Sequence, residues 1–246
     1  MVKSERLDQI VKLLQEQKYV SVDTLVHQLH YSPATIRRDI TQLSDLGIVK
    51  KSYGGICLNE APKSIFLRNH EFVEEKLRIG KKAVELIEDR ETVFIAGASS
   101  TYLMESFLSE KKDITVVTTD LRLAAKLHEK GIRCYCTGGQ LRDSVLTGPL
   151  ALQTIRGMHF HTCFFSISAL SRDGVMSSPS EEFAETVKEL LVHSDRAICL
   201  CLGKHIGKEQ FLSLGDLSAI HTIISDEKFP SELIERYPTT KFLTAE

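Results

Sequence analysis

The sequence predicts an α/β protein of two domains: a small helical domain that ends in a β-hairpin, residues 1–58, and a larger, mostly parallel α/β sheet domain, residues 76–246, with a linker at 59–75. Three observations support this division. Apolar residues recur at helical spacing three times in the first 45 residues, whereas short apolar runs alternate with amphipathic stretches in the second half. Between these regions the periodicity is lost and Pro62 interrupts the chain.

The composition is that of an ordinary globular protein, and it limits where a polyanion could bind. Of the 246 residues 42% are hydrophobic and 26% are charged, and the net charge is −2. Such a chain has no broad basic surface, so nucleic-acid binding would need a local basic patch. No run approaches the roughly 20 apolar residues that span a bilayer. The first residues contain no apolar signal core, so we expect a cytoplasmic protein without membrane contact.

Three short helices are predicted at the start of the chain. The first two present one apolar face each, made of Leu7, Ile10, Val11 and Leu14, and of Val22, Leu25, Val26 and Leu29. Ser21 and Asp23 offer capping oxygens to the second helix. A three-residue turn, residues 30–32, then leads into the third. Ser32 is a favourable N-cap residue, and Pro33 suits the first helical position because its missing N–H is not needed there.

The third helix is followed by a predicted hairpin. Ile36, Ile40 and Leu43 give the helix its buried stripe, and Gly47 is a natural stop. Residues 48–58 then alternate and are interrupted by two glycines, which is typical of a β-hairpin. Three helices and a hairpin in this order predict a winged helix-turn-helix.

The exposed face of the third helix is the predicted DNA-binding surface. At 100° per residue the buried stripe lies within about 40°, and Arg38 lies opposite it, near 200°. In a helix-turn-helix the second helix of the motif enters the major groove, where arginine can bind guanine or a phosphate. We therefore expect DNA contacts from Ser32, Thr35, Arg37, Arg38, Thr41 and Gln42, and from Lys50 and Lys51 of the hairpin. A merely solvated charged face is the alternative, but it leaves the turn, the cap and the hairpin unexplained.

The second domain is predicted from alternating helices and strands. Helices are expected at 76–89, up to about 109, at 121–130 and at 180–194, and strands at 92–96, 114–119, 133–137, 162–168, 196–202 and 221–225. Apolar strands separated by amphipathic helices are typical of a parallel sheet that is covered on both faces.

Small and polar residues follow four of these strands. They are Gly97, Ala98, Ser99, Ser100 and Thr101, then Thr119 and Asp120, then Gly138 and Gly139, and finally Lys204. In open α/β sheets, ligands bind beyond the carboxyl ends of the strands, where backbone N–H groups converge. Small residues allow close approach, hydroxyl groups donate hydrogen bonds, and a lysine adds positive charge, which together suit a phosphate. We predict an effector-binding crevice here; turns that serve only close packing are the alternative.

The six cysteines indicate no disulfide framework. Cys134 and Cys136 share one face of a strand, as do Cys199 and Cys201, so a zinc site would require these two strands to be neighbours. Buried free thiols in a reducing compartment are the other interpretation, and we predict neither metal nor cofactor.

The chain resembles the DeoR (deoxyribonucleoside regulator) family of bacterial transcription factors. The resemblance rests on SPATIRRDITQL at 32–43, GIVK at 47–50 and GG at 54–55, and on VFIAGASST, VVTTDL, TGGQLR, LTGPLA and LGKHIG in the second domain. It implies a DNA-binding regulator, usually a repressor, that acts as a dimer or tetramer. Its C-terminal domain would resemble sugar-phosphate isomerases and sense a phosphorylated sugar or related metabolite. Tyr53 stands where the family usually has a histidine, and its hydroxyl can still donate to a DNA phosphate.

The predicted crevice departs from the family pattern at four positions. Ala96 and Cys201 stand where aspartates are usual, Ala98 where a glycine is usual, and Thr119 where an asparagine is usual, while Lys204 remains. Two alternatives stay open: an effector different from the common ones, or a ligand-independent regulator whose second domain only oligomerises.

An active isomerase is a further alternative. Its chemistry needs an acid–base pair near the sugar carbons, and the nearest carboxylates by sequence are Asp120, Asp143, Glu181 and Glu182. Acidic residues in loops and at helix starts more often cap helices or face solvent, and a shared fold does not imply a shared activity. We therefore predict that the protein is not an enzyme.

Overall fold

The computed structural model describes residues 3–45, 49–58 and 72–246. The chain forms two compact units, Met1–Glu71 and Phe72–Glu246. Most of the predicted linker, and the predicted helix stop at Gly47, lie outside the described residues. Helix α5 begins at Val73, so the last three residues of the predicted linker, Val73–Glu75, are helical.

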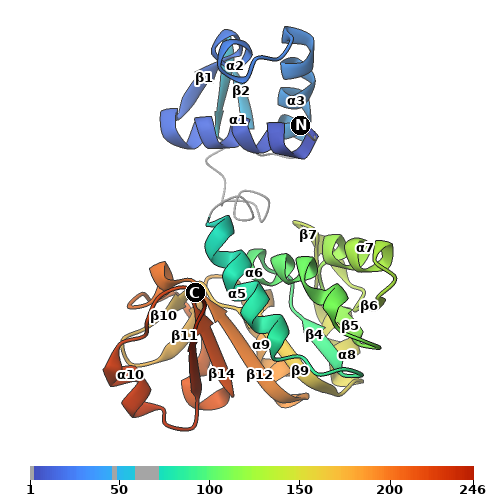
Figure 1. Ribbon diagram of the computed structural model, residues 1–246, viewed down its shortest axis with the longest axis vertical. Coiled ribbons are helices and arrows are strands. Elements are labelled where there is room, and N and C mark those ends of the chain that lie inside the picture. The colour runs from blue at the N-terminus through green and yellow to red at the C-terminus, as the bar shows by residue number, and fades with distance from the viewer. Residues whose placement is uncertain (1–2, 46–48, 59–71) are drawn as a thin grey trace. The chain divides into compact units, whose positions relative to one another are not determined.

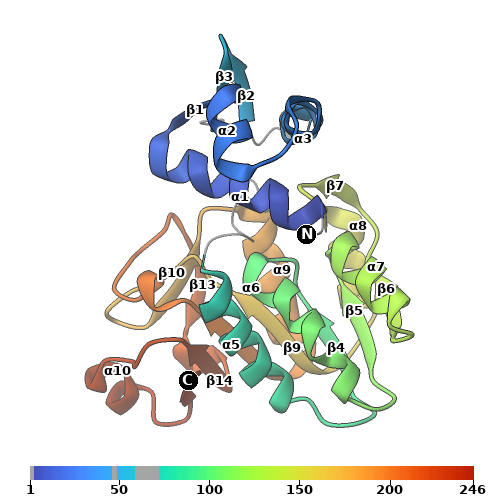
Figure 2. The same ribbon diagram turned by 45° about the horizontal axis from the view of Figure 1, so that its top comes forward.

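The N-terminal unit combines three helices with a three-stranded antiparallel sheet (Figures 1 and 2). The helices are α1 (Lys3–Gln17), α2 (Val22–Leu29) and α3 (Pro33–Asp45), and the strands are β1 (Tyr19–Ser21), β2 (Val49–Ser52) and β3 (Gly55–Leu58), in the order β1-β3-β2. The predicted winged helix-turn-helix is confirmed. Strand β1 was not predicted, because three residues are too few to show an alternating pattern.

One apolar core holds this unit together. The buried residues of the predicted helix faces meet there, joined by Val20, Val49 and Ile56 of the sheet. Each such side chain contributes about 1.5–3 kcal/mol when it leaves water. Gly55 is required by a close approach, since a Cβ at this position would lie 2.4 Å from the Val20 carbonyl oxygen.

The C-terminal unit is built on a seven-stranded parallel sheet, as predicted, in the order β15-β14-β12-β9-β4-β5-β6. The strands are β4 (Thr92–Ile95), β5 (Thr115–Thr118), β6 (Arg133–Cys136), β9 (Phe160–Ser166), β12 (Ser194–Cys201), β14 (Thr222–Ser225) and β15 (Lys241–Thr244). Among the described residues no helix is long and apolar enough to cross a membrane.

Helices cover both faces of the sheet, and a separate core lies under each layer (Figures 1 and 2). One face carries α5 (Val73–Glu85), α6 (Ser99–Tyr102) and α7 (Leu121–Glu129). The other carries α8 (Pro149–Arg156), α9 (Glu181–Val192) and α10 (Ser231–Arg236). The helix predicted to run to about residue 109 is shorter than expected: α6 has four residues and continues as two 3₁₀ turns, η1 (Leu103–Ser106) and η2 (Leu108–Glu110).

Several short elements escaped prediction. They are the hairpin β7 (Gln140–Arg142) and β8 (Val145–Thr147), the small antiparallel sheet β10 (Ala169–Leu170), β11 (Val175–Ser178) and β13 (Leu212–Asp216), the 3₁₀ turns η3 (Gly203–His205) and η4 (Leu217–Ala219), and β15, α8 and α10. Strand β7, for example, is exposed along its whole length, so its sequence carries no apolar alternation.

The β7–β8 hairpin folds back over the carboxyl ends of the parallel strands. The Leu146 amide donates to the Thr119 carbonyl oxygen at 2.7 Å, and the Leu121 amide donates to the Ser144 carbonyl oxygen at 3.0 Å. The hairpin therefore becomes part of the edge where the crevice was predicted.

Candidate DNA-binding and effector-binding sites

The N-terminal ends of α2 and α3 are capped as the sequence predicts. The Ser21 hydroxyl accepts a hydrogen bond from the Thr24 amide at 3.0 Å, and the Ser32 hydroxyl accepts one from the Thr35 amide at 3.2 Å. The hydroxyl oxygens of Ser32 and Thr35 also lie 2.8 Å apart. These two side chains, which the sequence also assigns to DNA contacts, thus fix the start of α3.

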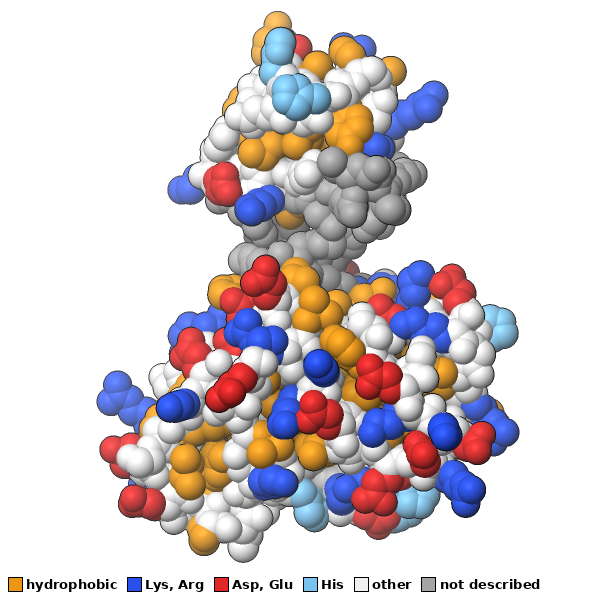
Figure 3. Space-filling model, in the orientation of Figure 1, with side chains coloured by type: hydrophobic (Ala, Val, Ile, Leu, Met, Phe, Trp, Pro, Cys, Tyr) orange, Lys and Arg blue, Asp and Glu red, His pale blue; other side chains and the backbone are white. Residues whose placement is uncertain are grey.

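The outer face of α3 is as predicted. Ile36, Ile40 and Leu43 are buried, whereas Arg37 and Arg38 are exposed. Thr41 is also exposed, Gln42 is half-buried, and the Lys51 ammonium lies 3.4 Å from the Thr41 hydroxyl oxygen. Figure 3 shows basic side chains projecting from the side of the N-terminal unit on which α3 lies in Figure 1.

The hairpin presents its polar groups to solvent. Lys50 and Lys51 are exposed on β2, and the Tyr53 side chain at the turn is fully exposed. The Tyr19 hydroxyl donates to the Tyr53 carbonyl oxygen at 2.9 Å, which ties the turn to strand β1. The Tyr53 hydroxyl thus projects from a backbone that is held in place.

A buried ion pair on the inner side of α3 was not predicted. Asp39 is 1% exposed, and its two carboxylate oxygens accept hydrogen bonds from the Arg6 Nε at 2.5 Å and Nη2 at 3.0 Å. The Arg6 guanidinium carbon also lies 4.8 Å from the centroid of the Tyr31 ring. The sequence places an acidic residue, Asp39, directly after two arginines and on the same side of the helix as the apolar stripe. Its partner Arg6 lies 33 residues earlier in the chain, so no local pattern indicates the pair.

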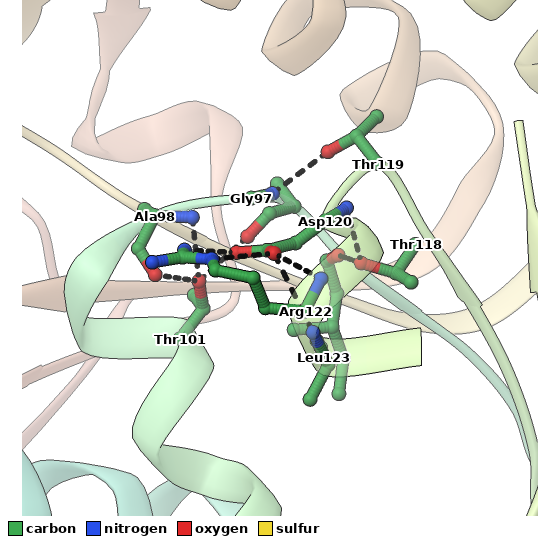
Figure 4. Close-up of polar contacts among 10 residues, drawn as sticks. Gly97, Ala98, Thr101, Thr118, Thr119, Asp120, Arg122 and Leu123 are labelled. Carbon is green, nitrogen blue, oxygen red and sulfur yellow. Dashed lines mark hydrogen bonds and ion pairs between the residues drawn. The ribbon is translucent and has the colours of Figure 1, made fainter. Parts of the chain in front are cut away.

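In the C-terminal unit, the loop between β4 and α6 uses its hydroxyl groups internally (Figure 4). The Thr119 hydroxyl accepts a hydrogen bond from the Gly97 amide at 2.8 Å, and the Thr101 hydroxyl accepts one from the Ala98 amide at 3.1 Å. The Thr101 hydroxyl also donates to the Ala96 carbonyl oxygen at 2.6 Å. Both threonine side chains are buried, so their hydroxyl groups stabilise the loop and are not exposed to solvent.

Asp120 is likewise engaged. Its Oδ1 caps α7 by accepting from the Arg122 amide at 2.9 Å, and the Arg122 guanidinium binds both carboxylate oxygens (Figure 4). The guanidinium carbon lies 4.7 Å from the centroid of the Tyr102 ring, whose burial raises the pKa of its hydroxyl. The carboxylate is 1% exposed and paired, so a sugar hydroxyl would have to displace Arg122 to reach it. Arg122 and Tyr102 were not predicted to belong to this edge.

The glycines of the predicted crevice are needed for packing. A Cβ at Gly97 would lie 2.8 Å from Val145 Cγ2, and one at Gly139 would lie 2.4 Å from the Thr147 carbonyl oxygen. Gly138 and Gly139 also have φ values of +75° and +116°. At Gly97 and Gly139 the structure therefore supports the alternative interpretation, in which these turns serve close packing.

Lys204 belongs to η3, after β12, and strand β9 separates that strand from β4. Its ammonium lies 3.7 Å from the centroid of the Phe72 ring. Lys76, which lies on the inner face of α5, is 2% exposed and was not predicted to matter. Burial and the ammonium groups of Lys204, Lys208 and Lys76 lower the pKa of His205 to about 4. Positive charge therefore gathers at the carboxyl end of β12.

A shallow pocket of about 230 Å³ lies elsewhere. Thr92, Thr115 and Phe160 line it at the first residues of their strands, so it opens at the amino-terminal edge of the sheet, opposite the predicted crevice. Its lining surface is mostly apolar, although it includes the side chains of Thr92, Thr115 and His159.

Of the acids considered for catalysis, Glu182, like Asp120, has another partner, and the other two are exposed. Glu182 accepts a hydrogen bond from Arg142 Nη1 at 2.6 Å, and its own backbone N–H, together with Arg142, lowers the pKa of Glu182. Asp143 and Glu181 are exposed, the former in the hairpin turn with φ +47°.

The cysteine pairs do not meet. Cys134 and Cys136 lie on β6, and Cys199 and Cys201 lie on β12, with β9, β4 and β5 between them in the sheet. A zinc site shared by these four thiols is therefore excluded, and among the described residues no cluster of three metal-binding side chains occurs. Burial raises the pKa of Cys134 to about 11.

Comparison with known families matches both units. Residues 6–61 match the DeoR-like helix-turn-helix domain, and residues 71–227 match the DeoR C terminal sensor domain. The lactose phosphotransferase system repressor of Staphylococcus epidermidis is 30% identical over 96% of this chain and 98% of its own length. The HTH-type transcriptional regulator GlpR of Haloferax volcanii is 31% identical over 92% of this chain and 91% of its own length.

Solved structures resemble the fold at low sequence identity. The eIF2B delta subunit from Chaetomium thermophilum is 19% identical over 67% of this chain and 60% of its own, with a TM-score of 0.51. Ribose 5-phosphate isomerase A from Methanocaldococcus jannaschii is 12% identical over 53% of each chain, with a TM-score of 0.40.

Proposed function

Since the chain belongs to the DeoR family of DNA-binding transcriptional repressors, with both its helix-turn-helix and its sensor domain, we propose that α3 reads an operator in the major groove and that the sensor domain binds a phosphorylated sugar or related metabolite as effector. Membership places the chain among regulators and not among enzymes. The observation that carries the proposal for DNA is the opposed arrangement on α3, with Arg37 and Arg38 exposed and Asp39 buried against Arg6.

Different residues of the DNA-binding unit have different proposed roles. Arg37, Arg38, Thr41 and Gln42 lie along the exposed part of α3 and reach base edges or adjacent phosphates. Lys50, Lys51 and Tyr53 on the hairpin contact the DNA backbone, which contributes affinity and orientation but no direct sequence information. Ser32 and Thr35 hold the first turn of the helix that enters the groove.

The effector site is proposed at the carboxyl ends of the strands. It comprises Gly97, Ala98, Ser99, Ser100, Thr101, Thr119, Asp120, Gly138, Gly139 and Lys204. Because Thr101, Thr119 and Asp120 have protein partners and Ser100 is only 5% exposed, the half-buried Ser99 hydroxyl is the side-chain group of the loop proposed for the ligand. The Lys204 ammonium is proposed beside it and would have to leave its contact with the Phe72 ring. The names of the relatives, which refer to lactose phosphotransferase systems, support a carbohydrate-derived effector.

The proposed assembly is a dimer or tetramer in the cytoplasm. Two copies of α3 would then read operator half-sites about one helical turn apart, and a closed symmetric oligomer would set that spacing. The effector shifts this arrangement only if it binds one state of the protein more tightly than the other.

A ligand-independent regulator is the second candidate, and the pairing of Asp120 with Arg122 favours it. Thermal unfolding of the full chain with a panel of sugar phosphates separates the two candidates, because a ligand of the folded state raises the melting temperature. We expect at least one compound to raise it, and Lys204→Ala to remove the rise while operator affinity persists. No rise with any compound would favour the second candidate.

A further inference from the structure

Strand β6 forms an open edge of the seven-stranded sheet. Strand β5 pairs with it on one side, and among the strands that the structure describes none lies on the other side. Figure 2 shows β6 at the outside of the C-terminal unit. Arg133, Tyr135 and Cys136 are exposed, and Tyr135 is 53% exposed. An edge strand of this kind offers unpaired N–H and C=O groups to a further strand.

The opposite edge of the sheet is less open. Three of the four residues of its strand β15 are half-buried, and the Phe242 ring packs against the Phe229 ring with centroids 5.1 Å apart. At the β6 edge, by contrast, the shallow apolar pocket lies beside Tyr135 and includes its neighbour Val117 on the same face of the sheet. Apolar surface and unpaired backbone therefore occur together at β6.

The backbone pairing fixes which groups of β6 point outward. The Thr137 amide donates to the Thr118 carbonyl oxygen of β5 at 3.3 Å, so Thr137 directs its amide towards β5. Successive residues of a paired strand direct their N–H and C=O groups alternately to its two sides. Tyr135 therefore also faces β5, whereas the N–H and C=O groups of Cys134 and Cys136 point to the open side.

We propose that β6 is an interface between two copies of this chain, which pair antiparallel about a two-fold axis at Tyr135. The inference rests on the proposed function, in which the protein is a dimer or tetramer. In this register Cys134 lies opposite Cys136 of the second copy, and Cys136 lies opposite Cys134. Residues opposed in this way exchange both of their N–H···O bonds. Every outward N–H and C=O group of the two residues then has a partner, because the stretch Cys-Tyr-Cys is symmetric about Tyr135.

The same register suits the side chains. Tyr135 lies opposite its own copy at a position without hydrogen bonds, where the Cα atoms are about 4.5 Å apart and the side chains are closest. Aromatic pairs across neighbouring strands are favourable. The two copies of Arg133 lie about 13 Å apart along the strands, so their positive charges do not meet. A two-fold contact of this kind closes on itself and adds no further copies.

The first test traps the interface in the full chain. In a background that carries Cys134→Ala and Cys136→Ala, Tyr135→Cys places a thiol at the axis, where a Cα separation of about 4.5 Å permits a disulfide. Val192→Cys in the same background is the matched control, since Val192 is 76% exposed at the end of α9. Mild oxidation and non-reducing electrophoresis measure the covalent dimer. We expect Tyr135→Cys to crosslink, and the control and the background to stay mostly uncrosslinked.

The second test breaks the interface. Tyr135→Asp places two carboxylates opposite each other and should raise the dissociation constant at this contact roughly tenfold or more. Analytical ultracentrifugation should then find half of the wild-type mass, while Val192→Asp keeps the wild-type mass. Circular dichroism checks that each variant is folded, which we expect because Tyr135 is exposed.

The outcomes separate this interface from the proposed assembly. A wild-type chain that associates, while Tyr135→Asp keeps its mass and Tyr135→Cys does not crosslink, overturns the β6 interface alone. A wild-type chain that stays monomeric at every concentration overturns both the proposed assembly and the β6 interface.

Discussion

Arg6 on α1 holds the buried Asp39 carboxylate of α3 through two hydrogen bonds, of 2.5 and 3.0 Å. Asp39 directly follows Arg37 and Arg38, and the three side chains point to different sides of one helical turn. The ion pair therefore acts with the buried apolar stripe of α3 to fix the rotation of the helix about its axis, and with it the direction in which the two exposed arginines project.

Asp39→Ala should destabilise the N-terminal unit by about 1–3 kcal/mol, because it leaves the partly buried Arg6 guanidinium without its carboxylate. Urea unfolding of the full chain, followed by tyrosine fluorescence and circular dichroism, measures the loss. Glu129→Gln is the control, since its pair with Lys126 is exposed and screened by water, so its loss should leave the stability nearly unchanged. Equal stability of the two variants would show that the pair does not hold α3.

Arg38→Ala should weaken operator binding by about 1–3 kcal/mol, which corresponds to roughly a 5- to 150-fold loss of affinity. Fluorescence anisotropy with an operator selected from random DNA gives the affinity. Lys50→Ala should instead weaken binding to all sequences and reduce the slope of log affinity against log salt by about 1. The control Lys12→Ala changes an exposed lysine of α1 outside the proposed surface. Full affinity in Arg38→Ala would contradict the assignment of α3 to the groove.

Gly139→Ala should destabilise the sensor unit by about 1–3 kcal/mol, because the added methyl meets the Thr147 carbonyl oxygen at 2.4 Å and the backbone has φ +116°. The comparison is Gly157→Ala, where the nearest atoms lie at 3.6 Å. Melting temperatures of both variants, with hydrogen exchange across β7 and β8, measure the effect. A hairpin that stays protected in Gly139→Ala would mean that its docking over β4 and β5 does not need this glycine.

Stability should fall on the acid side of neutrality because of His205. Its pKa is about 4 in the folded chain against 6.5 ordinarily, so between these values the unfolded chain binds more protons. The free energy of unfolding therefore rises with pH through this window. The stabilising contribution of neutral His205 is lost as the pH falls from about 6.5 towards 4. His205→Gln removes this contribution, so its melting temperature should vary less than that of the wild type over the same range. Parallel pH profiles for the two chains would show that His205 does not cause the loss of stability in acid.

Local patterns were enough for the fold class and for the exposed face of α3 that is proposed to bind DNA. The positions of Ile36, Ile40 and Leu43 on α3 depend only on helical periodicity, so the exposure of Arg38 followed from the sequence. The strand ends of β4 and β5 were also predicted to lie together, since parallel neighbours end at one edge of a sheet. Residues that matter through partners close in sequence, such as Ser32 and Thr35, belong to the same class.

Only the tertiary structure decided which of the predicted polar groups remain open to a ligand. Asp120 looked like a group for a sugar hydroxyl, but it caps α7 and pairs with Arg122, which stacks on Tyr102 of another helix. Lys204 looked like a partner for the Gly97 loop, but it rests on Phe72, 132 residues earlier in the chain by the difference of their numbers. Periodicity and capping are interactions within a few residues, and the sequence shows them directly. Charge pairing and ring contacts between distant segments depend on how the helices pack on the sheet, and no local pattern records that packing.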